Sequence, residues 1–554
     1  MVIVPDSDII LIKSPLKLDN YNQITFANAT EQYNYFHSLT HLEYEGCTYQ
    51  RKDGVIRYKT NQEDDYGVAT GNPKFEDLLK YNYCMYKNDS YQDKWFYAFV
   101  TDIKYINDGM TEVTIETDVF QTWQFDIVYK NSFVEREHVN DDTIGKHTLP
   151  EGLETGDYII NNAGKVTSKL QTCYICMSVT WAPDNTPDLD NTNRIYNSIY
   201  SGTTLILFRN ASDCSNFIKC YDKLGHGDAI TNIYMIPISA TGVDPEAGSN
   251  VWKTYTYDNI TTSFCLCPYS TGITMLEQNL TYNINSTING YTPKNNKLFT
   301  FPYNYLSISN NNGTQVDFKY EDFINAQPIF DIGCCVTAGG QNMMIPKNYK
   351  LNTGAVGYDI FYTYGIAGGK FPTCSWNTDP YTNWLTQNGV NILGMKIDAP
   401  TSQALGGSIE ALIGGATGQF LSVGSGLGKM FGSIQEMYRH SMQSPTLEGQ
   451  TSSGDYTYAW GNSTFTYYRM SIKKEYAMII DDFFTLYGYK VNDVKTPNIH
   501  QRSNWDFIKC SDVNLEGDIP EKDLDKIRSL FNNGCTFWHT TTYYLDYTRT
   551  NAII

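Results

Sequence analysis

The chain has 554 residues, a formal net charge of −19 at pH 7 and an aromatic content of 14%, including 44 tyrosines. This length supports about three or four domains with sizeable cores, and the acidic balance argues against a basic surface that recognises nucleic acid. An acidic wall is still compatible with DNA that slides past without being held. Abundant Tyr, Thr and Asn favour strands and turns over helices.

The N-terminal sequence has no basic stretch before its apolar residues and no small-residue cleavage site, so it does not indicate a secretory signal. The 13 cysteines are an odd number spread over the chain, unlike a disulfide scaffold. Three closely spaced pairs lie in apolar, strand-like runs, and we interpret them as buried structural cysteines: Cys173 and Cys176, Cys265 and Cys267, Cys334 and Cys335.

Residues 8–26 predict strands. Asn28 with Glu31 three residues later forms a capping box, which predicts a short helix through about His37. Two runs with strand character, 94–105 and 111–117, then flank an Asp-Gly pair and predict a hairpin. On the second strand of this hairpin, Val113 and Ile115 share one face, which we expect to face the core. Glu112, Thr114 and Glu116 share the opposite face, which can form an acidic wall.

Residues 160–330 continue as short β-like runs broken by Asn, Gly and Pro, with few helical patterns. Further on, 472–487 has helical spacing and ends at Gly488, and Pro520 opens a second helix that ends at Gly534. The first of these helices is expected to bury one broad face made of Tyr476, Ile479, Ile480, Phe483 and Tyr487.

Between these regions, residues 403–432 contain nine glycines and only two charges. Burying the large apolar side chains is worth on the order of 15–30 kcal/mol before ordering costs. Something must therefore cover this segment. These side chains are Leu405, Ile409, Leu412, Ile413, Phe420, Leu421, Val423, Leu427, Met430 and Phe431.

The uncharged run 411–428 is at the short end of a bilayer span and rich in glycine and serine, which argues against a lone transmembrane helix. Two interpretations stay open: a disordered or core-buried glycine-rich loop, and a membrane-active segment stored in a soluble particle. Pairs of glycines four residues apart permit close packing of backbones. They are Gly414 with Gly418, Gly424 with Gly428, and Gly428 with Gly432.

Folded structure is expected on both sides of this segment, at about 393 and 455. A hairpin of about 58 residues reaches about 95 Å when extended and about 43 Å as two helices. Either length exceeds the hydrocarbon core of a bilayer, about 30 Å.

No catalytic, cofactor or metal site is predicted. The eight histidines are scattered and form no HExxH motif, and the glycine tract lacks the Lys-Ser/Thr of a phosphate-binding loop. Glu135 and Glu137 share a strand face and could form an acid/base pair. A solvated or ion-paired strand end is the interpretation that we favour.

Three N-terminal motifs, KWFYAFV at 94–100, ETDVFQTWQFD at 116–126 and FVEREHV at 133–139, resemble the tail knob, or distal tail-tube, proteins of picovirus-type short-tailed phages of Gram-positive bacteria. The C-terminal motifs FFTLYGYK at 483–490, IRSLFNNG at 527–534 and FWH at 537–539 agree, and the apolar loop falls where that family carries one.

The resemblance implies a mainly β, tail-tube-like fold that assembles into a hexameric tube in the virion. It also implies other tail proteins as partners, namely the collar or proximal tube and the tail tip. Six apolar loops would plug the tube, and on infection they would form a channel in the host cytoplasmic membrane. Genomic DNA would pass without specific binding, and no cofactor is implied. Six copies carry 6 × −19 = −114 formal charges.

The expected division has five parts. They are an N-terminal tube-wall domain (1–160), a middle β-rich knob region (161–330), a second tube-wall segment (331–392), the plug or membrane-penetrating loop (393–455) and C-terminal strands and helices (456–554). An alternative function is that of an adhesin, in which the Tyr- and Asn-rich middle region binds cell-wall glycan. A tail-borne wall hydrolase is a third hypothesis, which the missing active-site pattern disfavours.

Overall fold

The protein is built mainly of β-sheets with a few helices, as its composition predicts. The structure, a computed structural model, describes residues 7–19, 21–60, 72–88, 94–166, 173–181, 194–270, 274–311, 313–337, 340–350, 364–370, 373–377, 448–451 and 465–554. The chain forms two compact units. Unit 1 contains Met1–Glu154, Pro293–Leu298 and Glu475–Ile554, and unit 2 contains Thr155–Thr292 and Phe299–Lys474. The two ends of the chain therefore belong to one folded body, and the middle of the chain forms the other. The five-part division given above stays a prediction.

The first sheet of unit 1 is antiparallel, with strand order β3-β1-β5-β6-β7-β4. The predicted hairpin is confirmed, since β6 and β7 pair as far as Asn107↔Met110 around the Asp-Gly turn. Val113 and Ile115 are buried, as expected. The strands are β1 (Ser7–Ile12), β3 (His41–Cys47), β4 (Val55–Lys59), β5 (Tyr83–Asn88), β6 (Trp95–Asn107) and β7 (Met110–Thr117).

Three short helices accompany this sheet: α1 (Ala29–Ser38), α2 (Phe75–Leu78) and α3 (Val119–Trp123). The predicted start of α1 is confirmed, because the Asn28 side chain accepts a hydrogen bond from the backbone N–H of Glu31. Helix α1 buries Phe36, whose ring stacks on Tyr83 of β5 with the ring centroids 5.2 Å apart. This contact attaches the helix to the sheet.

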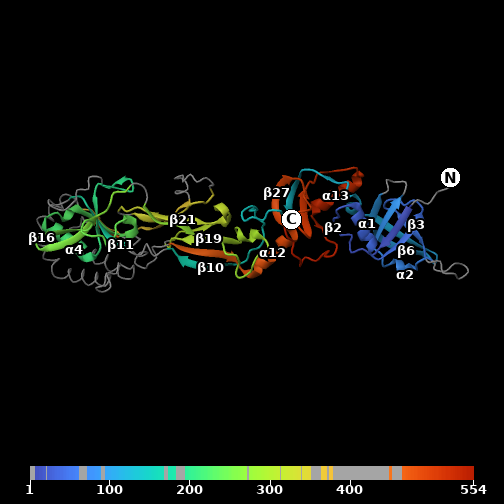
Figure 1. The fold of residues 1–554 in the computed structure, drawn as a ribbon, viewed down its shortest axis with the longest axis horizontal. Helices are drawn as coiled ribbons and strands as arrows, with labels where there is room; N and C mark the ends of the chain where they lie inside the picture. The colour runs from blue at the N-terminus through green and yellow to red at the C-terminus, as the bar shows by residue number, and fades with distance from the viewer. Residues whose placement is uncertain are drawn as a thin grey trace. The chain divides into compact units, whose positions relative to one another are not determined.

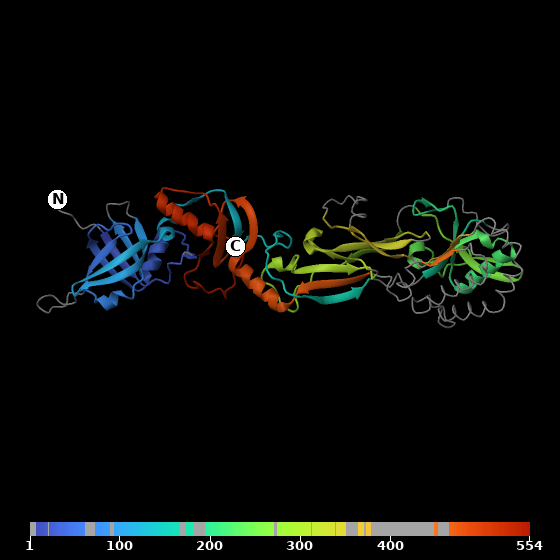
Figure 2. The ribbon, with the colours of Figure 1, turned by 180° about the vertical axis from the view of Figure 1, so that it is seen from behind.

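The second sheet of unit 1 joins both ends of the chain, with strand order β2-β30-β28-β9-β27. Strand β2 pairs in parallel with β30, with Asn22 opposite Thr536. Figure 2 shows the blue and red segments side by side in this unit. The strands are β2 (Asn22–Ile24), β9 (Ser132–Glu137), β27 (Tyr489–Lys495), β28 (Trp505–Ser511) and β30 (Cys535–Trp538), and a small separate pair is β8 (Val128–Tyr129) with β29 (Leu515–Glu516).

Both C-terminal helices are present, as α12 (Lys474–Tyr487) and α13 (Glu521–Asn533). The predicted apolar face of α12 is wrong, because only Ile480 of its five residues is fully buried, whereas Ile479 is 67% exposed and Tyr487 is also exposed. The face of α12 that is buried is set by Asp481. This residue is buried and accepts hydrogen bonds from the backbone N–H groups of Lys294 and Asn295. A buried carboxylate that is fully hydrogen-bonded thus takes a core position.

The described residues of unit 2 form two four-stranded sheets, one seven-stranded sheet and a two-stranded hairpin. The smaller sheets are β10-β26-β19-β20 and β18-β21-β22-β23. Their strands are β10 (Tyr158–Lys165), β26 (Thr466–Ile472), β19 (Asn304–Ser309), β20 (Gln315–Phe318), β18 (Thr274–Thr281), β21 (Ile329–Cys334), β22 (Gln341–Pro346) and β23 (Ile366–Lys370). The hairpin pairs β12 (Ile195–Tyr196) with β13 (Ile199–Tyr200).

The seven-stranded sheet has the order β16-β17-β14-β11-β15-β24-β25. Its strands are β11 (Cys173–Val179), β14 (Thr204–Phe208), β15 (Ile230–Pro237), β16 (Lys253–Tyr257), β17 (Ile260–Leu266), β24 (Thr373–Asn377) and β25 (Glu448–Thr451). Helix α4 (Ala211–Lys223) packs against this sheet through Phe217, whose ring contacts those of Phe208 and Phe264 (Figure 1). A four-residue helix, α5 (Ile238–Thr241), follows β15.

Helix α4 was not predicted from the sequence. Its signal is the Asn210 side chain, which accepts from the Asp213 N–H at the helix start. Phe217, Cys220 and Tyr221 then follow at helical spacing and are buried.

Candidate functional site

The apolar side chains and the close-packing glycines predicted for 403–432 all lie outside the described residues. The structure does describe the strands on either side of this segment. Strand β24 pairs with β25 in antiparallel fashion, with Asn377 opposite Glu448. The residues between these partners, 378–447, number 447 − 378 + 1 = 70. The residues that precede and follow this 70-residue segment are therefore neighbours in one sheet.

The base of this segment is attached to a buried sheet. Strand β24 pairs with β15, with Asn232 opposite Ser375, and β15 pairs with β11. Every residue of β11 and β14 is buried, so these central strands have both faces covered. A hydrogen-bonded pair of strands added to such a sheet is a firm attachment for the ends of a long insertion.

The cysteines of this region are structural, as predicted. Cys173 and Cys176 lie buried in β11 and are free thiols, and burial raises the pKa of Cys176 to about 12. A thiol with so high a pKa is neutral at physiological pH, and a neutral thiol is a poor nucleophile. The prediction of full burial is wrong for Cys335, which is only half-buried next to buried Cys334.

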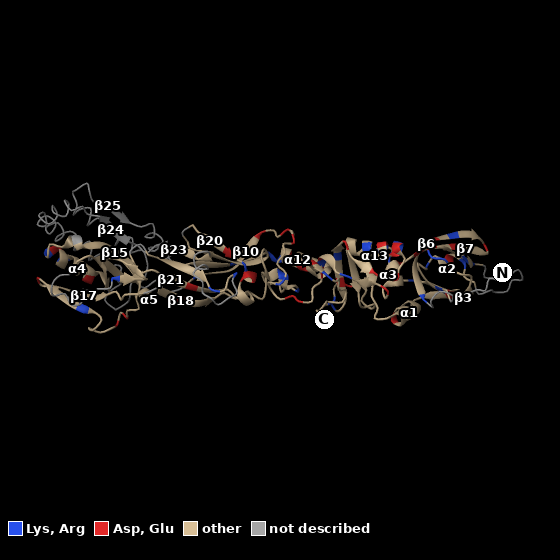
Figure 3. Cartoon of the chain, turned by 90° about the horizontal axis from the view of Figure 1, so that it is seen from above, with Lys and Arg blue, Asp and Glu red and all other residues tan. Residues whose placement is uncertain are grey.

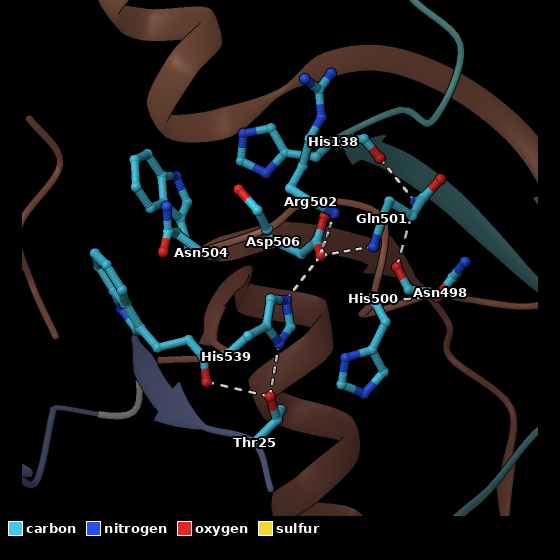
Figure 4. A network of polar contacts seen from close by, with 12 residues as sticks. Thr25, His138, Asn498, His500, Gln501, Arg502, Asn504, Asp506 and His539 are labelled. Atoms are coloured by element: carbon cyan, nitrogen blue, oxygen red, sulfur yellow. Dashed lines mark hydrogen bonds and ion pairs between the residues drawn. The ribbon is translucent and has the colours of Figure 1, made fainter. Parts of the chain in front are cut away.

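In unit 1 the structure brings together a threonine, a histidine and an aspartate from distant parts of the sequence (Figure 4). Thr25 Oγ1 lies 2.8 Å from Nδ1 of His539, and Nε2 of His539 lies 2.9 Å from Oδ2 of Asp506. The Thr25 hydroxyl also donates to the carbonyl of Trp538, and both Thr25 and Asp506 are buried. This cluster ties β2 and β30 to β28. We interpret it as structural, since a catalytic hydroxyl must reach a substrate.

The same network continues to His138. Oδ2 of Asp506 accepts hydrogen bonds from the backbone N–H groups of Gln501 and Arg502, and the Gln501 side chain donates to the carbonyl of His138. The His138 ring accepts from the Phe507 N–H through Nδ1, and its Nε2 lies 3.1 Å from the Thr485 carbonyl. Burial lowers the pKa of His138 to about 4. The imidazole is therefore neutral and holds three chain segments together.

Glu135 and Glu137 have separate partners, as an ion-paired strand end requires. Glu137 is buried and pairs with Lys495, and burial raises the pKa of its carboxyl. Glu135 pairs with Lys509, whose hydrogen bond lowers the pKa of Glu135. Of the two alternatives that we favoured, a solvated or an ion-paired strand end, the structure shows the ion-paired one. A bulge that skips Glu135 in the pairing of β9 with β28 gives the two carboxylates different surroundings.

Charges on the outer face of β7 are balanced by cations. Glu112 pairs with Arg57 of β4 and Glu116 pairs with Lys526 of α13. Figure 3 shows acidic and basic residues beside one another around α13. An acidic tube wall stays a prediction. Among the described helices, none combines the length and the apolar character that crossing a membrane requires.

Comparisons with known proteins agree with a tail component. The profile of the family described as "Bacillus phage phi29, Tail knob protein gp9, C-terminal domain" matches residues 268–552, just over half of the chain. A second profile, "Caudoviral major tail protein N-terminus", matches residues 6–130. The tail knob proteins gp9 of Bacillus phages B103 and phi29 are 24% and 26% identical, over 97% and 96% of both chains, respectively.

A solved structure has the same fold over the whole chain. The structure of the bacteriophage C1 tail knob protein, gp12, matches with a TM-score of 0.62 and 15% identity, covering 99% of this chain and 100% of that chain. Fold and comparisons together define a mainly β structural protein of the phage tail. The chain belongs to the family of the phi29 tail knob protein gp9. The family resemblance found in the sequence is thereby confirmed.

Proposed function

We propose that this protein forms the distal tube and knob of a short, non-contractile phage tail and that residues 403–432 act first as a plug and then as a membrane channel. The observation that carries this proposal is the pairing of β24 with β25, which brings both ends of the intervening 70 residues to one place. An insertion attached in this way can leave one environment and enter another without unfolding the sheet that holds it.

The composition of the segment suits both environments. Six copies in a lumen bury one another's apolar side chains, and the glycines permit the close approach that a narrow bore demands. Moving into lipid exchanges one apolar surrounding for another, so the free-energy difference is only a few kcal/mol. A modest trigger then shifts the balance between the two states.

Leakage of dye from liposomes tests the membrane step. The purified full-length protein and a peptide of residues 403–432 are each expected to release the dye. Matched controls carry Ile413→Asp and Leu421→Asp, because each new carboxylate costs about 2.5–3.5 kcal/mol at the centre of a bilayer. Intact liposomes with the unmodified samples, or equal leakage from the substituted ones, would count against insertion.

Particle imaging tests the plug and the assembly. We expect rings of six copies, with density for 403–432 inside the lumen of DNA-filled particles and absent from the lumen of emptied ones. Density that is the same in both kinds of particle would exclude a plug that leaves on ejection. A different ring size would exclude the hexamer.

A second candidate function, binding of cell-wall glycan by unit 2, has its own observation. Ile199 and Tyr200 of β13 are 53% and 68% exposed, and Tyr269 is 61% exposed. Ser270, next to Tyr269, exchanges backbone hydrogen bonds with Ile195 and Ser198 of the same hairpin. Exposed aromatic rings of this kind are suited to stacking on sugars.

Binding of the purified protein to isolated cell walls checks this function. The double substitution Tyr200→Ala and Tyr269→Ala is expected to reduce the bound fraction, whereas Tyr158→Ala, a half-exposed tyrosine on β10, is not. Equal binding by both variants would remove these residues from any receptor site.

A further inference from the structure

Two histidines and a glutamate converge where helix α1 meets strand β3. His37 lies in the last turn of the helix, and His41 and Glu43 lie at the start of the strand. Nε2 of His37 is 3.6 Å from Oε2 of Glu43, and the two imidazole rings have centroids 4.4 Å apart. One ligand atom from each of the three residues lies within 4.8 Å of the other two.

The hydrogen bond of His41 fixes which nitrogen can act as a ligand. Its Nδ1 lies 2.9 Å from the carbonyl oxygen of Leu39, so Nδ1 carries the proton in the neutral ring. The lone pair is then on Nε2. Metal-binding histidines are commonly oriented by such a bond from the second ring nitrogen to a backbone carbonyl.

The three side chains are accessible to solvent. His37 and His41 are half-buried and Glu43 is exposed, so an ion can enter without a conformational change. The Tyr33 ring stacks on His37 at 5.3 Å and limits its rotation.

We propose that His37, His41 and Glu43 bind a divalent transition-metal ion, with Zn²⁺ as the ion that fits best. Two imidazole nitrogens and one carboxylate oxygen are ligands that Zn²⁺ prefers, at about 2.0–2.2 Å each. Tetrahedral coordination at these lengths places ligand atoms about 3.3 Å apart, close to the 3.6 Å between His37 and Glu43. The fourth position is open to water.

The ion would attach the end of α1 to an edge strand. Among the described strands, β3 is the outermost one of its sheet and pairs with β1 alone. Edge strands carry unpaired backbone groups on their outer side and are held less firmly than central ones. Binding at this place therefore stabilises the sheet at its edge and makes the stability of unit 1 depend on metal concentration.

The test uses the full-length protein after treatment with a chelator. We expect one Zn²⁺ to bind per chain, with a rise of a few degrees in the melting temperature of unit 1, and no response to Mg²⁺. Co²⁺ is expected to give the visible spectrum of a nitrogen and oxygen site without a thiolate charge-transfer band. This spectrum distinguishes the cluster from the free cysteines of the chain.

Substitutions assign the ligands. His41→Ala and Glu43→Gln are expected to weaken binding about tenfold or more, whereas Glu45→Gln, which removes the same charge from the same strand, is expected to leave it unchanged. Circular dichroism verifies that each variant is folded. Unchanged affinity in both ligand variants, an equal loss in Glu45→Gln, or a thiolate spectrum with Co²⁺ would overturn the proposal.

Discussion

At the scale of single residues, Gly488 links α12 to β27 at a position where no other residue fits. Its φ is +64°, and an added Cβ would overlap the backbone carbonyl of Glu137. We expect Gly488→Ala to destabilise unit 1 by about 3 kcal/mol or more, because left-handed strain and a clash with rigid backbone add together. Urea unfolding followed by tryptophan fluorescence measures this loss.

Gly242 provides the control for Gly488. Its φ is +68°, but an added Cβ would meet no atom within 4 Å. Gly242→Ala should therefore cost only the strain of the left-handed conformation, about 1–2 kcal/mol. Equal losses for the two substitutions would show that the close approach of Glu137 has no energetic effect.

Glu151 is a second residue on which unit 1 depends. Its side chain is fully buried and is paired with both Lys297 and Arg136. We expect Glu151→Gln to destabilise unit 1 by about 3–5 kcal/mol, since two largely buried cations lose their counter-charge. The control is Asp525→Asn, which removes an exposed partner of Arg528 and should cost less than about 0.5 kcal/mol. Similar effects in urea unfolding would contradict this account.

At the scale of elements, α4 depends on Asn210, the residue that caps its N-terminus. Asn210→Ala removes the side chain that accepts from the Asp213 N–H, and it should destabilise unit 2 by about 1 kcal/mol. Ser212→Ala, an exposed position in the first turn, should leave stability unchanged or raise it slightly. The fluorescence of Trp181 and Trp252 during urea unfolding separates these outcomes.

The elements that could be predicted are those with a local cause. The Asn28 cap, the Asp-Gly turn and the Pro520 and Gly534 boundaries each act on the backbone within a few residues, and each is confirmed. The buried face of α12 could not be predicted in this way. It depends on Asp481 and on two backbone N–H groups nearly 200 residues earlier.

At the scale of the whole molecule, two buried groups give opposite pH dependence. Burial lowers the pKa of His138 from 6.5 to about 4, so as pH falls from 6.5 to 4 the unfolded chain takes up a proton that the folded chain does not. Stability decreases over that window. Burial raises the pKa of Asp118 from 3.8 to about 6, so as pH falls from 6 to 3.8 the folded chain takes up the proton and stability increases.

Each contribution amounts to about 2 kcal/mol between pH 7 and pH 4.5, and the two nearly cancel. When the pH is lowered from 7 to 4.5, the unfolding free energy of His138→Gln should therefore rise by about 2 kcal/mol relative to that of the unmodified protein. The unfolding free energy of Asp118→Asn should fall by about 2 kcal/mol relative to the unmodified protein. Urea midpoints at both pH values measure these differences. Parallel pH profiles for all three proteins would contradict the assignment.

The sequence by itself determined those properties of the protein that depend on residue types and short motifs. Its β-rich fold, its family and the apolar character of 403–432 follow from residue types and short motifs, because propensity and hydrophobicity act locally. Only the tertiary structure decided that residues 22–24 pair with 536–538, that the chain on either side of the apolar segment meets at Asn377 and Glu448, and that His37 lies against Glu43. Such meetings depend on which distant surfaces bury one another, and this depends on the whole chain rather than on any short stretch of it.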